Sequence, residues 1–498
     1  MIAKAEVPLS PYIGLYDIVV PEDHELRKIK SLVDFSFVDE MLRDTYTADN
    51  GRPGYPPVMM FKYLLLKRIY ELSDRDLVKR AMSDMAFKYF LDLSPEEGVI
   101  DDTTLTKFRK LRLKDESVMD ELVRQSVQIA LDNGLQLSGT LIMDSTHSES
   151  KFGLKSAREY LLELCKNLRK KVYSVDESYH DKMPAKPDNM KIGLYEEVLD
   201  YCKKVIDTVK NDDRLSAYMN ISENISLLEE VMNDVNEELI LSKDEDAKTG
   251  HKSADSEFFG YKTHIAMTPE RIITAVSVSS GEKHDGKYLE SLVTKSKNNG
   301  IDVKAVVGDG AYSEADNITY ANRNDLKLVS KLSNVVAKGN RKNSLDDSFF
   351  FNKDAKMYVC PEGHMAIRKA RSGVKDPAKP LREIYFFDIE KCRSCPLKEK
   401  CGYRDNQKSR TYTVTVKMSK LHEDHQAKQK TEEYKILSKE RYKIEVKNAE
   451  LKNNYGYDEC VYAGLHGMSL QAGVSVFVVN VKRIMKLLEE KTRQKTDQ

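Results

Sequence analysis

The chain has 498 residues, of which 40% are hydrophobic and 32% are charged, enough for a sizeable core under a heavily charged surface. Its 23 glycines and 14 prolines are few, which excludes long low-complexity linkers and collagen-like repeats and favours a largely helical chain. Basic and acidic residues both number 80, so the net charge is zero. A nucleic-acid partner would therefore be held by local basic patches and not by a global field.

Composition also predicts the compartment. Seven cysteines are too few for a disulfide-framed secreted protein, and residues 1–20 lack a basic segment followed by an apolar one, so no signal peptide is expected. The longest apolar stretch, Leu470 to Val481, is about 12 residues, whereas a membrane-spanning helix needs about 20. We expect a soluble, cytoplasmic protein.

The first 135 residues are predicted to form a helical domain. Pro56 and Pro57 mark the start of one helix, because proline is favoured in the first helical turn. Ser73 is the expected N-cap of a second helix. A third is expected to begin at Asp102 or Thr103.

The third helix carries a strongly basic segment. Residues 107–114 hold five basic side chains and no acidic one, which suits a helix that contacts DNA phosphates in a helix-turn-helix-like domain. A solvated helix face is the alternative interpretation. The predicted DNA contacts are Lys107, Arg109, Lys110 and Arg112.

Downstream, the pattern predicts an α/β core that is interrupted twice. The core begins with a strand in 136–150, resumes as alternating strands and helices in 248–340, and ends with helices in 431–498. The interruptions are a helical insertion, 151–247, and a small cysteine-rich insertion, 341–430.

Two aspartates directly follow apolar runs that are typical of buried strands. Asp144 ends the run 140–143, and Asp309 follows the run 305–307. A buried carboxylate is costly unless it binds a cation or hydrogen-bond donors, so the pair is a candidate metal site. For either residue alone, a loop-starting aspartate is the preferred interpretation, since aspartate caps loops readily.

A third candidate lies on a charged helix near the C-terminus. Arg441, Glu445, Asn448 and Lys452 recur at spacings of four, three and four, which places them on one helix face. A carboxylate between two cations is either part of a surface ion-pair ladder or a metal ligand beside groups that hold phosphates. Periodicity does not separate these alternatives.

Four of the seven cysteines cluster late in the chain. Cys392 and Cys395 form a C-x2-C half-site, Cys360 and Cys401 complete an irregular set, and His364 could replace one cysteine. In a reducing compartment this cluster favours structural Zn²⁺. A set of reduced cysteines in a small β insertion is the alternative.

These acidic residues and their surroundings resemble the Asp-Asp-Glu (DDE) triad of bacterial insertion-sequence transposases. Arg441, Glu445 and Lys452 match the Arg-x3-Glu-x6-Lys signature of the IS-four/IS-five type superfamily, although Ser438 stands where a tyrosine is usual. The long segment between the first two acids and the cysteine cluster resemble its larger IS-eleven-eighty-two branch. The triad members are Asp144 in LIMDSTH, Asp309 in VVGDGAYSE and Glu445 in RYKIEVKNAELK.

The resemblance implies a ribonuclease-H-like fold, a mixed sheet that places the three carboxylates around two Mg²⁺ or Mn²⁺ ions. Such ions accept oxygen ligands and support in-line displacement at phosphorus. The implied activity is cleavage and strand transfer of double-stranded transposon ends, with Arg441 and Lys452 close to the DNA. A homodimer is expected to pair two ends. The apolar stripe over 221–239 is a candidate self-association surface, although packing within the insertion is the preferred interpretation.

Two other functions fit the same residues. A metal-dependent nuclease of the same fold would cleave DNA without strand transfer. A catalytically inactive, transposase-derived repressor would bind DNA without cutting it, and the presence of all three acids argues against this alternative. Joined products and metal-dependent cleavage distinguish the three functions.

Overall fold

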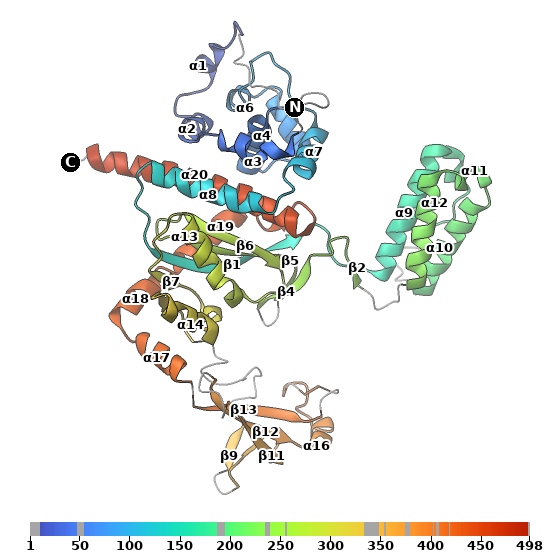
Figure 1. The fold of residues 1–498 in the computed structure, drawn as a ribbon. Helices are drawn as coiled ribbons and strands as arrows, with labels where there is room; N and C mark the ends of the chain where they lie inside the picture. The colour runs from blue at the N-terminus through green and yellow to red at the C-terminus, as the bar shows by residue number, and fades with distance from the viewer. Residues whose placement is uncertain are drawn as a thin grey trace.

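The computed structural model shows a mixed α/β protein with a central sheet, helices on both of its sides and two outlying units (Figure 1). It describes residues 10–46, 54–186, 195–234, 240–253, 256–332, 348–352, 355–373, 379–401, 403–404, 408–417 and 419–496. Within the described part of 248–340, strands and helices alternate, as the sequence predicts.

The N-terminal region is helical, as predicted. The side chain of Ser73 accepts a hydrogen bond from the Asp76 backbone N–H at 3.1 Å, which confirms the predicted N-cap. Asp101, one residue before the predicted start, caps the third predicted helix through the Thr103 N–H at 2.9 Å. The helices are α1 (Leu15–Val19), α2 (Glu25–Leu32), α3 (Phe37–Leu42), η1 (Arg43–Thr45), α4 (Pro57–Ile69), α5 (Asp74–Ala81), α6 (Met85–Phe90), α7 (Asp102–Arg112) and α8 (Ser117–Asp132).

The central sheet is mixed, with parallel and antiparallel neighbours around β1. Strand β1 is parallel to β7 and antiparallel to β5, and the order along the sheet is β4-β5-β1-β7-β8, with β6 on β5 and β14 on β1. The strands are β1 (Thr140–Ser150), β4 (Lys248–Ser253), β5 (Ser256–Met267), β6 (Ile273–Ser280), β7 (Ala305–Val307), β8 (Lys327–Val329) and β14 (Glu459–Cys460). The connecting helices are η3 (Asp285–Tyr288), α13 (Leu289–Asn298), η4 (Gly310–Ser313) and α14 (Ala315–Arg323).

The end of the apolar run 140–143 does not mark the end of the first strand. Strand β1 continues to Ser150, because its antiparallel pairing with β5 extends from Ile142 to Glu149. The parallel pairing with β7 covers only Thr140 to Ile142. Asp144 therefore lies within β1, just past the point where the neighbouring strand β7 stops.

Helix α20 (Gly464–Thr496) lies between the N-terminal helices and the sheet, side by side with α8 (Figure 1). Its Phe477 packs edge-on against Phe61 of α4, with ring centroids 5.6 Å apart. On the other side Ile484 joins the core that contains Leu141 of β1. The helices α8 and α20 touch closely at Gly473, where a Cβ would lie 3.0 Å from the Met119 Cα. The N-terminal helices thus share one hydrophobic core with the sheet.

Asn480 fastens this helix to the sheet edge by hydrogen bonds. Its Oδ1 accepts from the Ile273 N–H at 2.8 Å, and its Nδ2 donates to the Ile273 carbonyl at 2.8 Å and to Ser126 Oγ at 2.8 Å. The side chain is fully buried. Because a buried peptide group is costly without partners, Asn480 replaces a missing strand neighbour for Ile273.

By length and composition, the helix formed by 464–495 could also cross a membrane. The apolar stretch Leu470 to Val481 covers only part of this helix, which continues well beyond Val481. However, 78% of its apolar window is buried inside the protein. This is the behaviour of a core helix.

The helical insertion is a bundle that leaves the sheet on a two-stranded stem (Figure 1). Of the 221–239 stripe, Ile221, Ile225 and Leu228 are buried in the bundle's own core, which confirms the preferred interpretation for these residues. Val235 and Leu239 lie outside the described residues. The elements are β2 (Lys155–Ser156), α9 (Ala157–Val175), η2 (Glu177–His180), α10 (Tyr195–Lys210), α11 (Asp213–Ser216), α12 (Met219–Asp234) and β3 (Ile240–Leu241).

The cysteine-rich segment forms a small β unit at the far end of the molecule from α1 (Figure 1). The chain then returns to the sheet through helices, and the predicted helix over 431–451 breaks into two near Glu440. The elements are β9 (Phe350–Asn352), β10 (Met357–Val359), β11 (Arg368–Ser372), β12 (Leu381–Phe387), α16 (Ile389–Arg393), β13 (Arg410–Lys417), α17 (Lys420–Lys428), α18 (Glu432–Lys439) and α19 (Tyr442–Tyr455).

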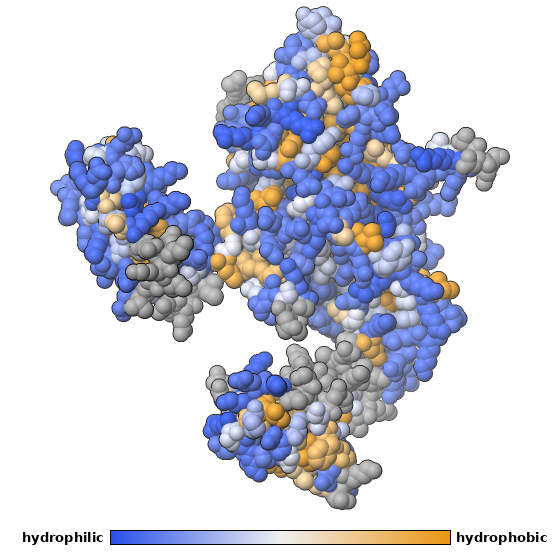
Figure 2. Space-filling model, turned by 180° about the vertical axis from the view of Figure 1, so that it is seen from behind, coloured by the Kyte–Doolittle hydropathy of each residue, from blue (hydrophilic) through white to orange (hydrophobic). Residues whose placement is uncertain are grey.

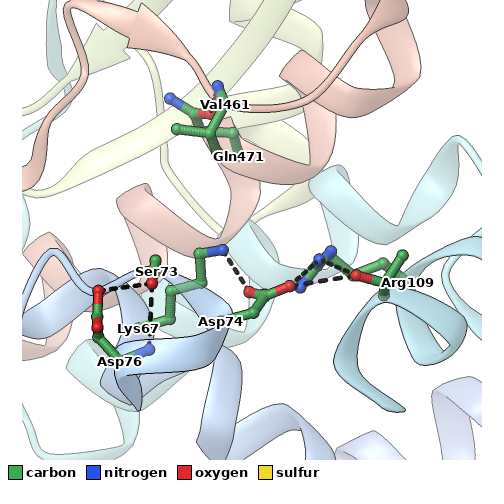
Figure 3. Close-up of polar contacts among 8 residues, drawn as sticks. Lys67, Ser73, Asp74, Asp76, Arg109, Val461 and Gln471 are labelled. Carbon is green, nitrogen blue, oxygen red and sulfur yellow. Dashed lines mark hydrogen bonds and ion pairs between the residues drawn. The ribbon is translucent and has the colours of Figure 1, made fainter. Parts of the chain in front are cut away.

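A charged cluster joins α4, α5 and α7 beneath the start of α20. Asp74 lies between Lys67 and Arg109 and is hydrogen-bonded to both (Figure 3). The Arg109 guanidinium and the Lys67 ammonium lie 4.9 and 5.5 Å from the Tyr462 ring centroid. Burial opposes ionisation of Asp74, but the hydrogen bonds and charges of Arg109 and Lys67 outweigh it and lower the pKa of this carboxyl. Nearby, Gln471 of α20 accepts from the Val461 N–H at 2.9 Å (Figure 3).

Replacing Asp74 with Asn is expected to lower the free energy of unfolding by about 3 kcal/mol, because it leaves two mostly buried cations without a counter-charge. Urea denaturation followed by circular dichroism measures the change. Asp102→Asn is the matched control, since its contact with the exposed Arg75 is 4.0 Å long and exposed pairs contribute at most about 1 kcal/mol. Equal losses in both variants would contradict the assignment.

Asn480→Leu is expected to destabilise the protein by about 2–5 kcal/mol, because the Ile273 N–H and carbonyl lose their partners and unsatisfied buried groups cost about 1–3 kcal/mol each. The midpoint of thermal unfolding should fall accordingly. The control is Asn324→Leu on α14, whose side chain is exposed and bonds only the Tyr320 carbonyl. A midpoint no lower than that of the control would refute the role of Asn480.

Candidate functional site

Two of the three predicted acidic residues lie at equivalent positions beyond the paired segments of two neighbouring strands. Ile142 of β1 pairs with Val307 of β7 in parallel register, and each carboxylate follows two residues later, at Asp144 and Asp309. Because side chains alternate along a strand, Asp144 lies on the same face as Ile142, the face that α19 covers. Asp309 caps η4 by accepting a hydrogen bond from the Ala311 N–H at 2.9 Å.

The Asp144 carboxyl is strongly desolvated. Its pKa is raised to about 6, mainly by burial. The Ser145 N–H and the Arg441 guanidinium lower this pKa, whereas the nearby Asp309 and Asp285 carboxylates raise it. A carboxylate with a raised pKa between other carboxylates is a group that gains from a bound cation. The carboxylates of Asp144 and Asp309 therefore form the electrostatic centre of the site.

Helix α19 approaches β1 through the predicted face. Asn448 donates to Asp144 Oδ2 at 3.2 Å, and Lys452 Nζ lies 3.1 Å from His147 Nε2. Burial, followed by the Lys452 charge, lowers the pKa of His147 to about 4, so the imidazole is neutral and accepts this hydrogen bond. The spacing of Asn448 and Lys452 thus correctly predicts one face.

Glu445, the third predicted acid, points elsewhere. It is 58% exposed and lies 3.6 Å from Arg441, one turn before Asn448. Among the residues that the structure describes, no three His, Cys, Asp or Glu side chains are close enough to hold a metal ion. The structure therefore brings Asp144 and Asp309 together and leaves Glu445 in an ion pair at the edge of the site.

Asp285, which the sequence analysis missed, lies beside the two aspartates. It receives Lys262 Nζ at 3.1 Å, and His264 Nδ1 lies 3.6 Å away. Its loop is pressed against the loop of Asp309, since a Cβ on Gly286 would lie 2.5 Å from the Ala311 carbonyl oxygen. The neighbouring His284 is instead exposed beside Glu314 at 3.3 Å.

His264, in the neighbouring strand β5, has a packing role. His264 is fully buried, stacks on Tyr288 at 3.7 Å and contacts Ser279 Oγ at 2.9 Å. Burial lowers its pKa to about 4, so the ring is neutral at pH 7. Tyr261 is likewise buried, as expected for strand packing, and donates to Asp244.

Polar atoms around the aspartates lack protein partners. Asn448 Oδ1 and Tyr312 Oη are buried and make no hydrogen bond within the described part of the chain. Burial and then the carboxylates of Asp285, Asp144 and Asp309 raise the pKa of Tyr312 well above its ordinary value, which places this hydroxyl among them. Two carboxylates with such unpaired oxygen atoms beside them fit a hydrated divalent cation with oxygen ligands.

The four predicted DNA contacts on helix α7 fall into two groups. Lys107 and Lys110 are exposed. Arg109 is the partner of Asp74, and Arg112 donates to the Thr45 carbonyl while lying 4.1 Å above the Tyr46 ring. The two arginines therefore already have intramolecular partners, and the two lysines remain accessible to a phosphate backbone.

The four clustered cysteines face one small cavity. It has a volume of about 30 Å³, and Cys360, Cys392, Cys395, Cys401 and His364 all line it. All four side chains are half-buried, and none of them forms a disulfide. The other three cysteines, Cys165, Cys202 and Cys460, are buried thiols elsewhere.

Two protein-family models match the chain. Residues 15–111 match a transposase domain described as DUF772, and residues 359–485 match a transposase DDE domain. The first covers α1 to α7, and the second includes Glu445 but neither Asp144 nor Asp309. Both matched models are transposase domains, and the mixed α/β architecture is consistent with a DDE nuclease fold.

A curated relative has no described activity. It is a protein of Rhizobium meliloti described as uncharacterized protein ORF8 in the nfe locus, 27% identical over 120 residues. That similarity covers 24% of this chain and 56% of the relative, so the chain spans little more than half of the relative's length. No solved structure matches the chain.

The raised pKa of Asp144 predicts a pH-dependent gain of stability in Asp144→Asn. In wild type without divalent cations, the stability linked to this carboxyl is full below pH 4 and is lost as pH rises through about 6. The variant should therefore be the more stable protein at pH 8, by at most about 3 kcal/mol, and the difference should vanish at pH 4. Thermal unfolding in a chelator across this range measures it. Asp302→Asn, at an 84% exposed side chain, is the control.

Proposed function

We propose that this protein binds the terminal inverted repeats of an insertion sequence and catalyses metal-dependent cleavage and strand transfer of DNA, with Asp144, Asp309 and Glu445 as its catalytic acids. The observation that carries the proposal is the parallel register of β1 and β7. It brings Asp144 and Asp309 to equivalent positions, two residues beyond the paired Ile142 and Val307, with α19 docked against Asp144. The mixed sheet around β1 supports a ribonuclease-H-like core, and the cysteine-rich unit supports the IS-eleven-eighty-two branch.

The residues of the site fit divalent cations. Asp144 and Asp309 would hold Mg²⁺ or Mn²⁺, with Asn448 and Tyr312 supplying polar neighbours for coordinated water. Bound Mg²⁺ would activate an attacking hydroxyl and stabilise the leaving oxygen in a displacement at phosphorus. The desolvated, raised-pKa state of Asp144 favours this occupancy, because a cation removes its repulsion from Asp309 and Asp285.

Glu445 would complete the set by leaving Arg441. Its helix already contacts β1 one turn later, at Asn448, so Glu445 lies on a helix that is already docked against Asp144. The freed Arg441 guanidinium would then bind a DNA phosphate, since guanidinium groups pair well with phosphate oxygens. Lys452 lies deeper, between His147 and Asp458, and would hold the α19 face against β1 near the DNA.

The N-terminal helices would deliver the DNA ends to this site. Lys107 and Lys110 of α7 are exposed and would contact phosphates. Because these helices share a core with α20 and the sheet, the distance between bound DNA and Asp144 is fixed by the fold. A homodimer would pair the two ends, and the cytoplasm is the compartment in which a bacterial transposase meets its DNA.

The proposal is tested with a labelled duplex that carries the element's own terminal repeat, in Mg²⁺ or Mn²⁺. Wild type should nick the end and join it to a target duplex. Asp144→Asn, Asp309→Asn and Glu445→Gln should each bind the duplex but lose cleavage and joining by at least about 100-fold, because each removes a charged cation ligand. Gel analysis of nicked and joined products measures both steps.

The controls separate the alternatives. Glu440, which directly precedes Arg441, pairs with Lys443. Glu440→Gln should therefore retain activity. Cleavage without joined products would favour a nuclease of the same fold. Binding without cleavage in wild type would favour a transposase-derived repressor, and full activity of Glu445→Gln would show that the third ligand is misassigned.

A further inference from the structure

The β unit formed by β9 to β13 contains an unusually placed group of thiols. Cys360 follows β10, Cys392 and Cys395 lie in and just after α16, and Cys401 lies in the next turn, yet all four line the same cavity of about 30 Å³. A space of this size is large enough for one small ion, since about 10–15 Å³ already admits a water molecule.

Tight backbone turns present these thiols. The Cys360 carbonyl accepts from the Gly363 N–H at 2.9 Å, and the Cys360 N–H donates to the His364 carbonyl at 2.8 Å. Gly363 has φ of +83°, a conformation that favours glycine. On the opposite side, the Cys395 N–H donates to the Cys392 carbonyl at 3.3 Å. The segments around Cys360 and around Cys392 and Cys395 are therefore short hydrogen-bonded turns, and each turn carries cysteines that line the cavity.

The hydrophobic core of this unit is too small to stabilise it alone. Apolar side chains on its surface are exposed, including Phe350 at 57% and Ile367 at 63%, and Figure 2 shows a hydrophobic patch on this lower part of the molecule. Small units with so little core usually depend on disulfides or a metal ion, and none of these four cysteines forms a disulfide. The fully buried apolar residues in the described part of the unit's core are Phe349, Ala366, Tyr385, Phe387 and Tyr412.

We propose that this cavity binds one structural Zn²⁺ through the thiolates of Cys360, Cys392, Cys395 and Cys401. Four thiolates suit the tetrahedral preference of Zn²⁺. The net charge of minus two that results would lie beside cationic side chains, because Lys391, Lys398 and Arg410 also line the cavity. Each thiol releases its proton to solvent on binding.

Binding would draw the four thiols together. In the described part of the chain they do not stand close enough to hold an ion as they are, so the side chains must rotate inward from their half-buried positions. His364 lines the same cavity but stays outside the ligand set. The ion would tie the β10 turn to α16 and so replace the missing hydrophobic core.

The test is the metal content of the full-length chain, purified without a metal-affinity tag. Inductively coupled plasma mass spectrometry should find about one zinc per chain in wild type and less than about 0.2 in Cys392→Ser/Cys395→Ser. The Co²⁺-substituted protein should show thiolate-to-metal charge-transfer bands, which oxygen ligands at the aspartate site do not give. His364→Ala should retain its zinc.

The matched control is Cys165→Ala/Cys202→Ala, which removes a different thiol pair with sulfur atoms 3.3 Å apart in the helical insertion. It should retain zinc and the cobalt spectrum. Zinc-free wild type after growth with added zinc, or zinc retained by the Cys392/Cys395 variant, would overturn the proposal. Trypsin digestion provides a second measurement, because a strong chelator should expose the β unit in wild type and change nothing in the already metal-free variant.

Discussion

Burial of α20 is the constraint on which the arrangement of the molecule depends. This helix contributes Phe477 to the aromatic core of the N-terminal helices and Ile484 to the core on the other side. A helix that is apolar on several sides must be covered on several sides, so the N-terminal helices and the sheet enclose it. Asn480 fixes the position of this helix along the sheet, because its side-chain amide has to meet both the N–H and the carbonyl of Ile273.

The candidate site results from the unequal lengths of the two pairings that β1 makes with its neighbouring strands β7 and β5. The short parallel pairing with β7 ends just before Asp144 and Asp309, while the long antiparallel pairing with β5 carries β1 onward. Beyond the end of β7, two carboxylates meet in a poorly solvated setting. Helix α19 then closes one side through Asn448, so charge is concentrated where the sheet changes partners.

The features that the sequence predicted correctly are those that local interactions determine. The N-cap at Ser73, the strand–helix alternation of 256–329 and the shared face of Asn448 and Lys452 all depend on residues a few positions apart. The pairing of Asp144 with Asp309 was suggested only by their similar settings, since strand register is a long-range property.

Features that depend on tertiary contacts escaped prediction. The continuation of β1 beyond the apolar run 140–143 has no local signal, because β5, more than 100 residues later, sets the length of this strand. Asp285 gave no signal because its loop reaches the site only by packing on the Asp309 loop. Arg109 resembles an exposed cation in sequence, and its partner Asp74 is a neighbour only after α5 and α7 pack together.

The stem of the helical insertion has an evolutionary consequence. The chain leaves β1 at Ser150, whose hydroxyl donates to Asp244 at 2.5 Å, and the strands β2 and β3 pair Ser156 with Ile240. The chain therefore enters and leaves the helical insertion at adjacent points, and the bundle has its own core. A module of this kind can be gained, lost or exchanged between lineages in one step, without altering the register of β1 and β5. The length of such chains can thus drift while the sheet beneath is inherited unchanged.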